Sequence, residues 1–297
     1  MSKLHYISHR EIDFVKWDQT ILNSKAPLVF AQSFYLNATS PGWDALIGEN
    51  YKCVFPITSK TKHGINYLPQ PHFTSQLGLF GDYTKEDLNF CIDYITKKYK
   101  LIEIELNHLC NHSTATKCTF VIKYKKSYSF NENTKRNISR AQNNGFKVED
   151  VKGSDAMHLS QTYLIPFLKN ELGLNEEAQS VFMILLKNAA EVNKLHTFKV
   201  INANGEVMAI GTFISNGKHT IFLKGTNFDK KENTGSMHLL VSHAIKYFED
   251  KSETFDFAGG SLSAGLAGFY KGLGGEQVDY GYLNINNLPW YIKLFKK

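Results

Sequence analysis

Three extended runs separated by Asn-Gly pairs are the feature that most restricts how this 297-residue chain can fold. The runs cover residues 195–201, 206–214 and 219–224, and the pairs between them are Asn204-Gly205 and Asn216-Gly217. Asn-Gly between such runs is the strongest short-range signal for a tight β-hairpin, because both residues tolerate positive φ. The sequence therefore predicts an antiparallel three-stranded meander.

An amphipathic helix and a further strand are expected after the meander. The segment 236–248 places its apolar residues on one helical face. These residues are Met237, Leu240, Val241, Ala244, Ile245 and Phe248. Strand 254–257 comes next, and a connection that contains a whole helix favours parallel pairing. We therefore expect strand 254–257 to lie parallel to strand 219–224.

The first third of the chain shows a similar order of elements. Residues 43–57 predict a hairpin, which a third strand near residues 65–68 would extend. A helix capping box begins at Thr84, and residues 101–106 alternate with the period of a strand. The same order recurs at residues 195–258 with little residue identity, which favours two similar α+β domains.

The composition changes between Cys118 and Arg140, and we interpret this stretch as the connection between the two domains. Basic residues alternate here with aromatic ones. They are Lys123, Tyr124, Lys125, Lys126, Tyr128, Phe130, Lys135 and Arg136. We predict an N-terminal domain of residues 1–125 and a C-terminal domain of residues 126–297, each a mixed, mostly antiparallel sheet flanked by helices.

Composition and missing motifs restrict the function. A net charge of +6 is too small to require a nucleic-acid partner, although it suits an anionic substrate. The four cysteines form no CxxC pair, and no HExxH, GxSxG or P-loop pattern occurs, which argues against metal, serine hydrolase and NTPase sites. No run approaches the ~18 apolar residues that a transmembrane helix needs, and the N-terminus has no signal core. We therefore expect a cytoplasmic protein.

Two glycine-containing motifs near the C-terminus carry a family resemblance. Residues 255–261 read FDFAGGS and residues 266–275 read LAGFYKGLGG. With the meander, the helix and the parallel strand, the second motif resembles the end of the GNAT fold of N-acetyltransferases, which often reads Ala-x-x-Phe-Tyr-x-x-x-Gly-Phe. The two motifs together resemble FemAB-type aminoacyl or peptidyl transferases, which pair two such domains. The fold class implied is α+β with tandem GNAT-like domains.

The resemblance also implies a reaction. Enzymes of this type transfer an acyl or aminoacyl group to an amine, here on a small molecule or peptide such as a cell-envelope precursor or related metabolite. No cofactor would be required, the donor substrate would be an acyl-CoA or an aminoacyl-tRNA, and tRNA would then be a partner. The loop before helix 236–248 keeps one glycine, Gly235, of the acetyltransferase pyrophosphate pattern, which weakens the case for coenzyme A. The sequence does not indicate an oligomeric state.

Tyr270 and Lys271 are the candidate catalytic residues. Tyr270 occupies the place where many acetyltransferases have a tyrosine that protonates the leaving thiolate, and a phenol with a pKa near 10 is protonated at neutral pH. FemAB-type members more often have Phe-Lys at this step, so the functional group is either Tyr270 or a lysine moved to Lys271. A purely structural interpretation, a tyrosine packed on a short helix, fits the sequence equally well.

Backbone amides near the two ends of the motif region are candidate binding groups. Gly259, Gly260 and Ser261 would present amides and a hydroxyl to a carbonyl or phosphate oxygen. Gly235 and Ser236 begin the predicted helix, whose N-terminal amides favour phosphate. The segment Gly259 to Ser261 is also explained by turn and capping requirements alone.

Further candidates are polar or basic. Lys224 and Asn227 end the third meander strand, where donor or acceptor would lie in this fold, although Lys224 also suits a solvated strand end. Arg136 and Arg140 are four residues apart on a predicted helix, so both could face one anion, whether tRNA or a nucleotide diphosphate. Two alternatives to an enzyme stay open: a non-catalytic binding or accessory protein with the GNAT fold and, less favoured, an RNA-binding protein.

Overall fold

The chain divides into two units, each with its own hydrophobic core. The computed structural model describes residues 4–228, 234–259 and 263–289. The first unit comprises residues 1–117 and 279–297, and the second comprises residues 118–278.

The bounds of these units differ in two ways from the predicted ranges, 1–125 and 126–297. The first unit ends eight residues earlier than predicted, since residues 118–125 belong to the second unit. It also includes the C-terminal segment, residues 279–297. That segment returns because residues 282–286 of β14 (Glu276–Asn286) pair antiparallel with β7 (Leu101–Glu105). Pairing between segments so distant in sequence has no local signal.

The second unit is built on a mixed sheet in the strand order β8-β13-β12-β11-β10-β9. Every neighbouring pair is antiparallel except β12 and β13, which are parallel. The predicted meander and the predicted parallel strand are therefore confirmed. The strands are β8 (Ala115–Lys123), β9 (Lys147–Val151), β10 (Leu195–Ile201), β11 (Val207–Ser215), β12 (His219–Asn227) and β13 (Thr254–Asp256).

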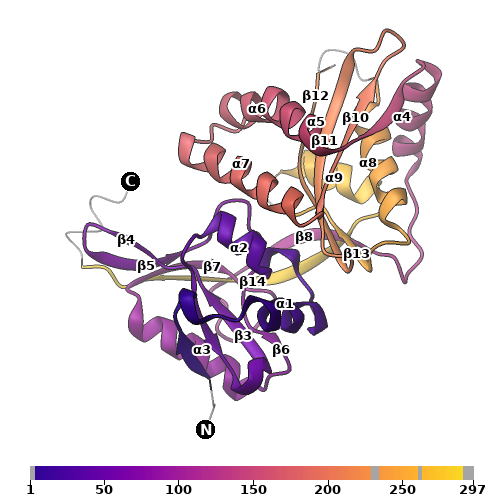
Figure 1. Ribbon diagram of the computed structural model, residues 1–297. Helices are drawn as coiled ribbons and strands as arrows, with labels where there is room; N and C mark the ends of the chain where they lie inside the picture. Colours follow the sequence, from indigo (N-terminus) through magenta and orange to yellow (C-terminus); the bar gives the residue numbers. More distant parts are fainter. Residues whose placement is uncertain (1–3, 229–233, 260–262, 290–297) are drawn as a thin grey trace. The chain divides into compact units, whose positions relative to one another are not determined.

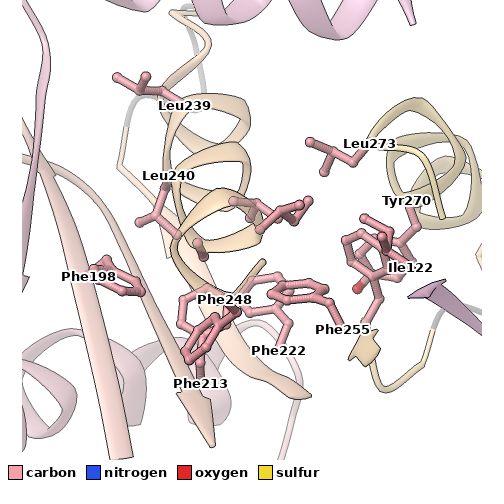
Figure 2. Packing of buried hydrophobic residues seen from close by; sticks show 14 of the residues in the cluster. Ile122, Phe198, Phe213, Phe222, Leu239, Leu240, Phe248, Phe255, Tyr270 and Leu273 are labelled. Carbon is pink, nitrogen blue, oxygen red and sulfur yellow. The ribbon is translucent and has the colours of Figure 1, made fainter. Parts of the chain in front are cut away.

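Helix α8 (Ser236–Phe248), with the predicted bounds, covers one face of this sheet. Its apolar face packs on side chains of the meander, and Figure 2 shows Phe198, Phe213 and Phe222 grouped around it. Helices α4 (Glu132–Asn143) and α9 (Ala264–Gly272) complete this side. The result is a core rich in phenylalanine, which holds α8 firmly against the strands.

The helices between β9 and β10 lie on the other side of the sheet (Figure 1). They are α5 (Gly153–Leu159), the π-helical turn η4 (Ser160–Leu164), α6 (Ile165–Asn170) and α7 (Glu176–Glu191). Pro166 lies in the first turn of α6. Proline is tolerated there because the first amides of a helix have no partner within the helix.

The first unit contains two sheets. The order β1-β2-β3-β6 is antiparallel throughout, while β4-β5-β7-β14 contains one parallel pair, β5 with β7. Helix α3 begins with the predicted capping box, in which Thr84 N–H donates to Asp87 Oδ2 (2.9 Å) and Asp87 N–H to Thr84 Oγ1 (3.3 Å). The elements are β1 (His5–Ile7), α1 (Phe14–Asn23), α2 (Ser33–Thr39), β2 (Asp44–Ile47), β3 (Cys53–Ile57), β4 (Lys60–Lys62), β5 (Ile65–Pro69), β6 (Phe80–Gly81) and α3 (Lys85–Lys98).

The prediction that residues 65–68 extend the hairpin of residues 43–57 is wrong. Strand β5 pairs with β4 and β7, and β1 occupies the position beside β2. The reason is a second tight turn: His63 and Gly64 have φ of 50° and 74°, which folds β5 back on β4. Among the described residues, no helix is long and apolar enough to cross a membrane.

Candidate functional site

Strands β12 and β13 separate after three residue pairs, and the separation opens a cavity in the second unit. Residues 219–221 pair with residues 254–256, whereas β12 continues to Asn227. Beside the opening, Leu223 is an additional residue in β12, because Thr212 pairs with Lys224 and Phe213 with Phe222. Such a bulge redirects the backbone and is common next to active sites. The cavity has a volume of about 590 Å³.

The cavity brings together most of the predicted site residues that the structure describes. Strand β12 contributes Lys224 and Asn227, the start of α8 contributes Gly235 and Ser236, and Gly259 and Tyr270 come from the segment after β13. Gly260 and Ser261 lie outside the described residues. Segments that are far apart in sequence thus line one space at the end of the parallel strand pair.

Three predicted residues lie elsewhere. Arg136 and Arg140 line a different, open cavity on α4 together with Glu132 and Lys135. Lys271 is exposed, with its Nζ 5.7 Å from the ring centroid of Phe120, and does not line the cavity. An anion-binding role for the two arginines and a catalytic role for Lys271 stay predictions.

The basic, aromatic stretch between Cys118 and Arg140 is partly neutralised. Lys125 Nζ lies 3.5 Å from Glu253 Oε2, and Lys126 Nζ lies 3.9 Å from Glu276 Oε2. Tyr124 donates its hydroxyl to Ile245 O (2.7 Å), so its ring is anchored to α8. These contacts favour a structural role for this stretch over phosphate binding.

A buried carboxylate, Asp256, holds the backbone that lines the cavity. Its Oδ1 accepts hydrogen bonds from Thr119 Oγ1 (2.6 Å) and from Ala258 N–H (2.7 Å). Its Oδ2 lies 3.3 Å from His219 Nε2. Ala258 has a φ of 52°, a left-handed conformation that costs a non-glycine residue of order 1–3 kcal/mol. The carboxylate therefore stabilises a strained turn at the cavity wall.

Tyr270 is buried against aromatic rings at the same wall. Its ring stacks on Phe257 with centroids 4.5 Å apart, and Phe120 and Phe269 lie at 6.0 and 5.8 Å. Burial, together with the nearby negative charge of Asp256, raises the pKa of Tyr270 to about 12. The phenol is therefore protonated at any physiological pH and suits a proton donor.

Lys224 lies between the sheet and the cavity. Burial lowers the pKa of its ammonium group below the ordinary value, which eases loss of its proton. Thr212, directly opposite Lys224 on β11, is fully buried, and within the described part of the chain its Oγ1 has no hydrogen-bond partner. Lys224 therefore lies beside a buried hydroxyl and is not a solvated strand end, which favours a binding role for this lysine.

Sequence reasoning missed His238, Glu171 and Phe167, which also line the cavity. His238 is the third residue of α8, and its ring meets that of Phe269 edge-on at 4.9 Å. The position of His238 just after Gly235, at the predicted start of the helix, could have indicated that it lies at the site. The sequence of α6, which carries Phe167, contains no such signal. Burial lowers the pKa of His238, and the positive charge of Arg140 lowers it further, so the imidazole is neutral at pH 7.

We expect Arg140→Ala to raise the pKa of His238, because the variant removes a positive charge that opposes protonation of the imidazole. The measurement is an NMR titration of the histidine ring protons, with His238→Gln to assign the resonance. Arg136→Ala, one turn earlier on α4, is the matched control and should leave the titration unchanged. A pKa that does not move in Arg140→Ala would refute the coupling.

Comparisons with solved structures identify the fold. FemX superimposes with a TM-score of 0.70 at 14% sequence identity, covering 99% of this chain and 100% of the other. The C-terminal domain of a putative lysylphosphatidylglycerol synthetase from Agrobacterium fabrum gives 0.59 at 10% identity, covering 96% and 94%. A tandem GNAT protein from the clavulanic acid biosynthesis pathway gives 0.54 at 9% identity, covering 96% and 99%.

The chain shares its fold with FemX and with a tandem GNAT protein. The predicted α+β class with tandem GNAT-like domains is thereby confirmed, as is the resemblance in fold to FemAB-like proteins. No protein-family model matches the sequence, and no curated protein matches it. At identities of 9–14% the comparisons establish the fold, so the activity must be argued from the cavity.

Proposed function

We propose that the second unit is an N-acyltransferase, which moves an acyl or aminoacyl group from a thioester or ester donor to an amine acceptor. The observation that carries the proposal is the cavity at the separated strands, where the bulged strand β12 faces the buried phenol of Tyr270. The fold shared with FemX and with a tandem GNAT protein supports the same reaction class.

The separated strand suits an extended donor. Within the described residues β13 pairs with β12 only as far as Ile221. From Phe222 onward, one edge of β12 still pairs with β11, and its other edge lies at the cavity. Backbone groups on such an edge form strong hydrogen bonds with the amides or carbonyl of a ligand. At one end of the cavity the amides of the first turn of α8, after Gly235, favour a negatively charged group.

The reaction balances with the groups that line the cavity. The neutral amine attacks the donor carbonyl and forms the C–N bond, and backbone amides beside the bulge stabilise the oxyanion. The C–S or C–O bond then breaks, and Tyr270 donates its proton to the leaving group. The nitrogen loses one proton, which restores the phenol, so no further reactant is needed.

Tyr270→Phe is expected to lower turnover by about 100-fold, since general acid catalysis contributes at least that much in comparable reactions. The assay measures N-acylation of a panel of amines with acyl-CoA and aminoacyl-tRNA donors. With the phenol protonated to about pH 12, the rate should not decline through loss of the acid at any pH below about 11.

Tyr247→Phe, a variant on the opposite end of α8, is the control and should keep full activity. Full turnover in Tyr270→Phe would remove the acid assignment. Donor binding without turnover of any amine would instead favour a non-catalytic binding protein with this fold.

A further inference from the structure

The cavity of the second unit has apolar side chains from its floor to its rim. The floor is formed by buried residues, among them Phe222, Leu223 and Phe257, with relative exposures of 8%, 5% and 1%. The rim carries Leu172 and Leu266, which are 45% and 48% exposed. Exposed apolar side chains that gather beside a cavity are typical of a ligand-binding groove.

The two rim leucines come from separate elements. Leu172 follows α6, and Leu266 lies in α9, which is distant from α6 in sequence. Met237 of α8 and Phe167 of α6 line the cavity between them and are half-buried. Apolar side chains of three separate elements thus line the cavity, and they do not come from one irregular loop.

We propose that this cavity binds the apolar chain of a medium- or long-chain acyl donor. The proposal rests on the proposed acyl transfer and names its substrate class. The alternative donors fit less well. An acetyl group would leave most of the apolar wall in water, and an aminoacyl donor would have to bury its ammonium group against apolar side chains. Glu171, the acidic residue of the lining, is exposed at the rim beside Leu172.

Chain length is the quantity that tests the proposal. Affinity is measured by calorimetry for coenzyme A and for its acetyl, butyryl, octanoyl and lauroyl thioesters, each below the concentration at which it forms micelles. Octanoate and laurate are titrated in parallel to separate the chain from the nucleotide. We expect about fourfold tighter binding for each added methylene between butyryl and octanoyl.

Rim variants locate the binding. Leu172→Glu and Leu266→Glu should each weaken lauroyl-CoA binding at least tenfold and change coenzyme A binding little, since only the chain contacts the rim. Leu109→Glu is the matched control: Leu109 is 49% exposed but belongs to the first unit, and its substitution should have no effect. Thermal unfolding of each variant verifies that the fold is retained.

The outcomes separate the two proposals. Equal affinity for acetyl and lauroyl thioesters, or equal loss in Leu109→Glu, would overturn the apolar-chain assignment while leaving acyl transfer intact. Chain-length-dependent binding that is lost in the rim variants, without acylation of any amine, would support the assignment and refute the transferase. Absence of binding for every thioester and fatty acid would overturn it as well.

Discussion

Asp256→Ala is expected to lower the free energy of unfolding of the second unit by about 3–5 kcal/mol, because three buried groups lose a hydrogen-bond acceptor at about 1–3 kcal/mol each. Asp256 is 1% exposed, and its carboxylate serves Thr119, His219 and the amide of Ala258. The variant leaves the hydroxyl, the imidazole and the amide without this acceptor inside the core. A loss of this size is a large fraction of the stability of an ordinary domain.

The isosteric variant separates shape from charge. In Asp256→Asn the amide oxygen still accepts from Thr119 and Ala258, and the amide nitrogen can donate to His219, so we expect a smaller loss than in Asp256→Ala. Stability is measured by urea unfolding followed with two spectroscopic probes. Asp250→Ala, at an exposed position after α8, should change stability by no more than about 0.5 kcal/mol. A loss below about 1 kcal/mol in Asp256→Ala would contradict the role of the network.

Gly235→Ala has a comparable expected effect, a loss of about 2–5 kcal/mol, because two costs combine at this residue. Gly235 has a φ of 82°, and left-handed backbone costs an L-residue about 1–2 kcal/mol. An added Cβ would also overlap the carbonyl oxygen of Asn137 on α4, and relieving such a backbone clash typically costs a further 1–3 kcal/mol. Helix α8 would have to move away from α4, which also displaces the start of α8 at the cavity.

Gly217→Ala is the matched control for this prediction. Gly217 has almost the same φ, 87°, but no heavy atom lies within 4 Å of the position of its added Cβ. Its substitution should therefore cost only the conformational part, about 1–2 kcal/mol. Equal losses in the two variants, measured by thermal and urea unfolding, would show that contact with Asn137 is unimportant.

Local signals were sufficient to predict much of the second unit. The two Asn-Gly turns predicted the meander, and the apolar face of residues 236–248 predicted α8 with its bounds. The capping box at Thr84 predicted the start of α3 in the first unit. In each case the residues that determine the structure are neighbours in sequence, so the pattern is visible without knowing the fold.

Pairing between distant segments could not be predicted in the same way. The sequence predicts the strand at residues 65–68 beside the hairpin of residues 43–57, whereas it pairs with β4 and β7. No local pattern predicts the pairing of β14 with β7. Which strand lies beside which depends on the packing of the whole unit, and strands of similar composition compete for the same neighbour. The bulge at Leu223 likewise depends on the register of β11 against β12.

The sequence alone determined the local order of elements: a glycine-containing turn after a short parallel strand, followed by Tyr270 and Lys271, in a fold that resembles FemAB-type transferases. Only the tertiary structure decided which of these neighbours lines the cavity. Adjacent residues on a helix point about 100° apart, so Tyr270 packs inward on Phe257 while Lys271 lies exposed. The same packing brought His238 and the leucines of the rim to the cavity, because elements distant in the chain enclose it together.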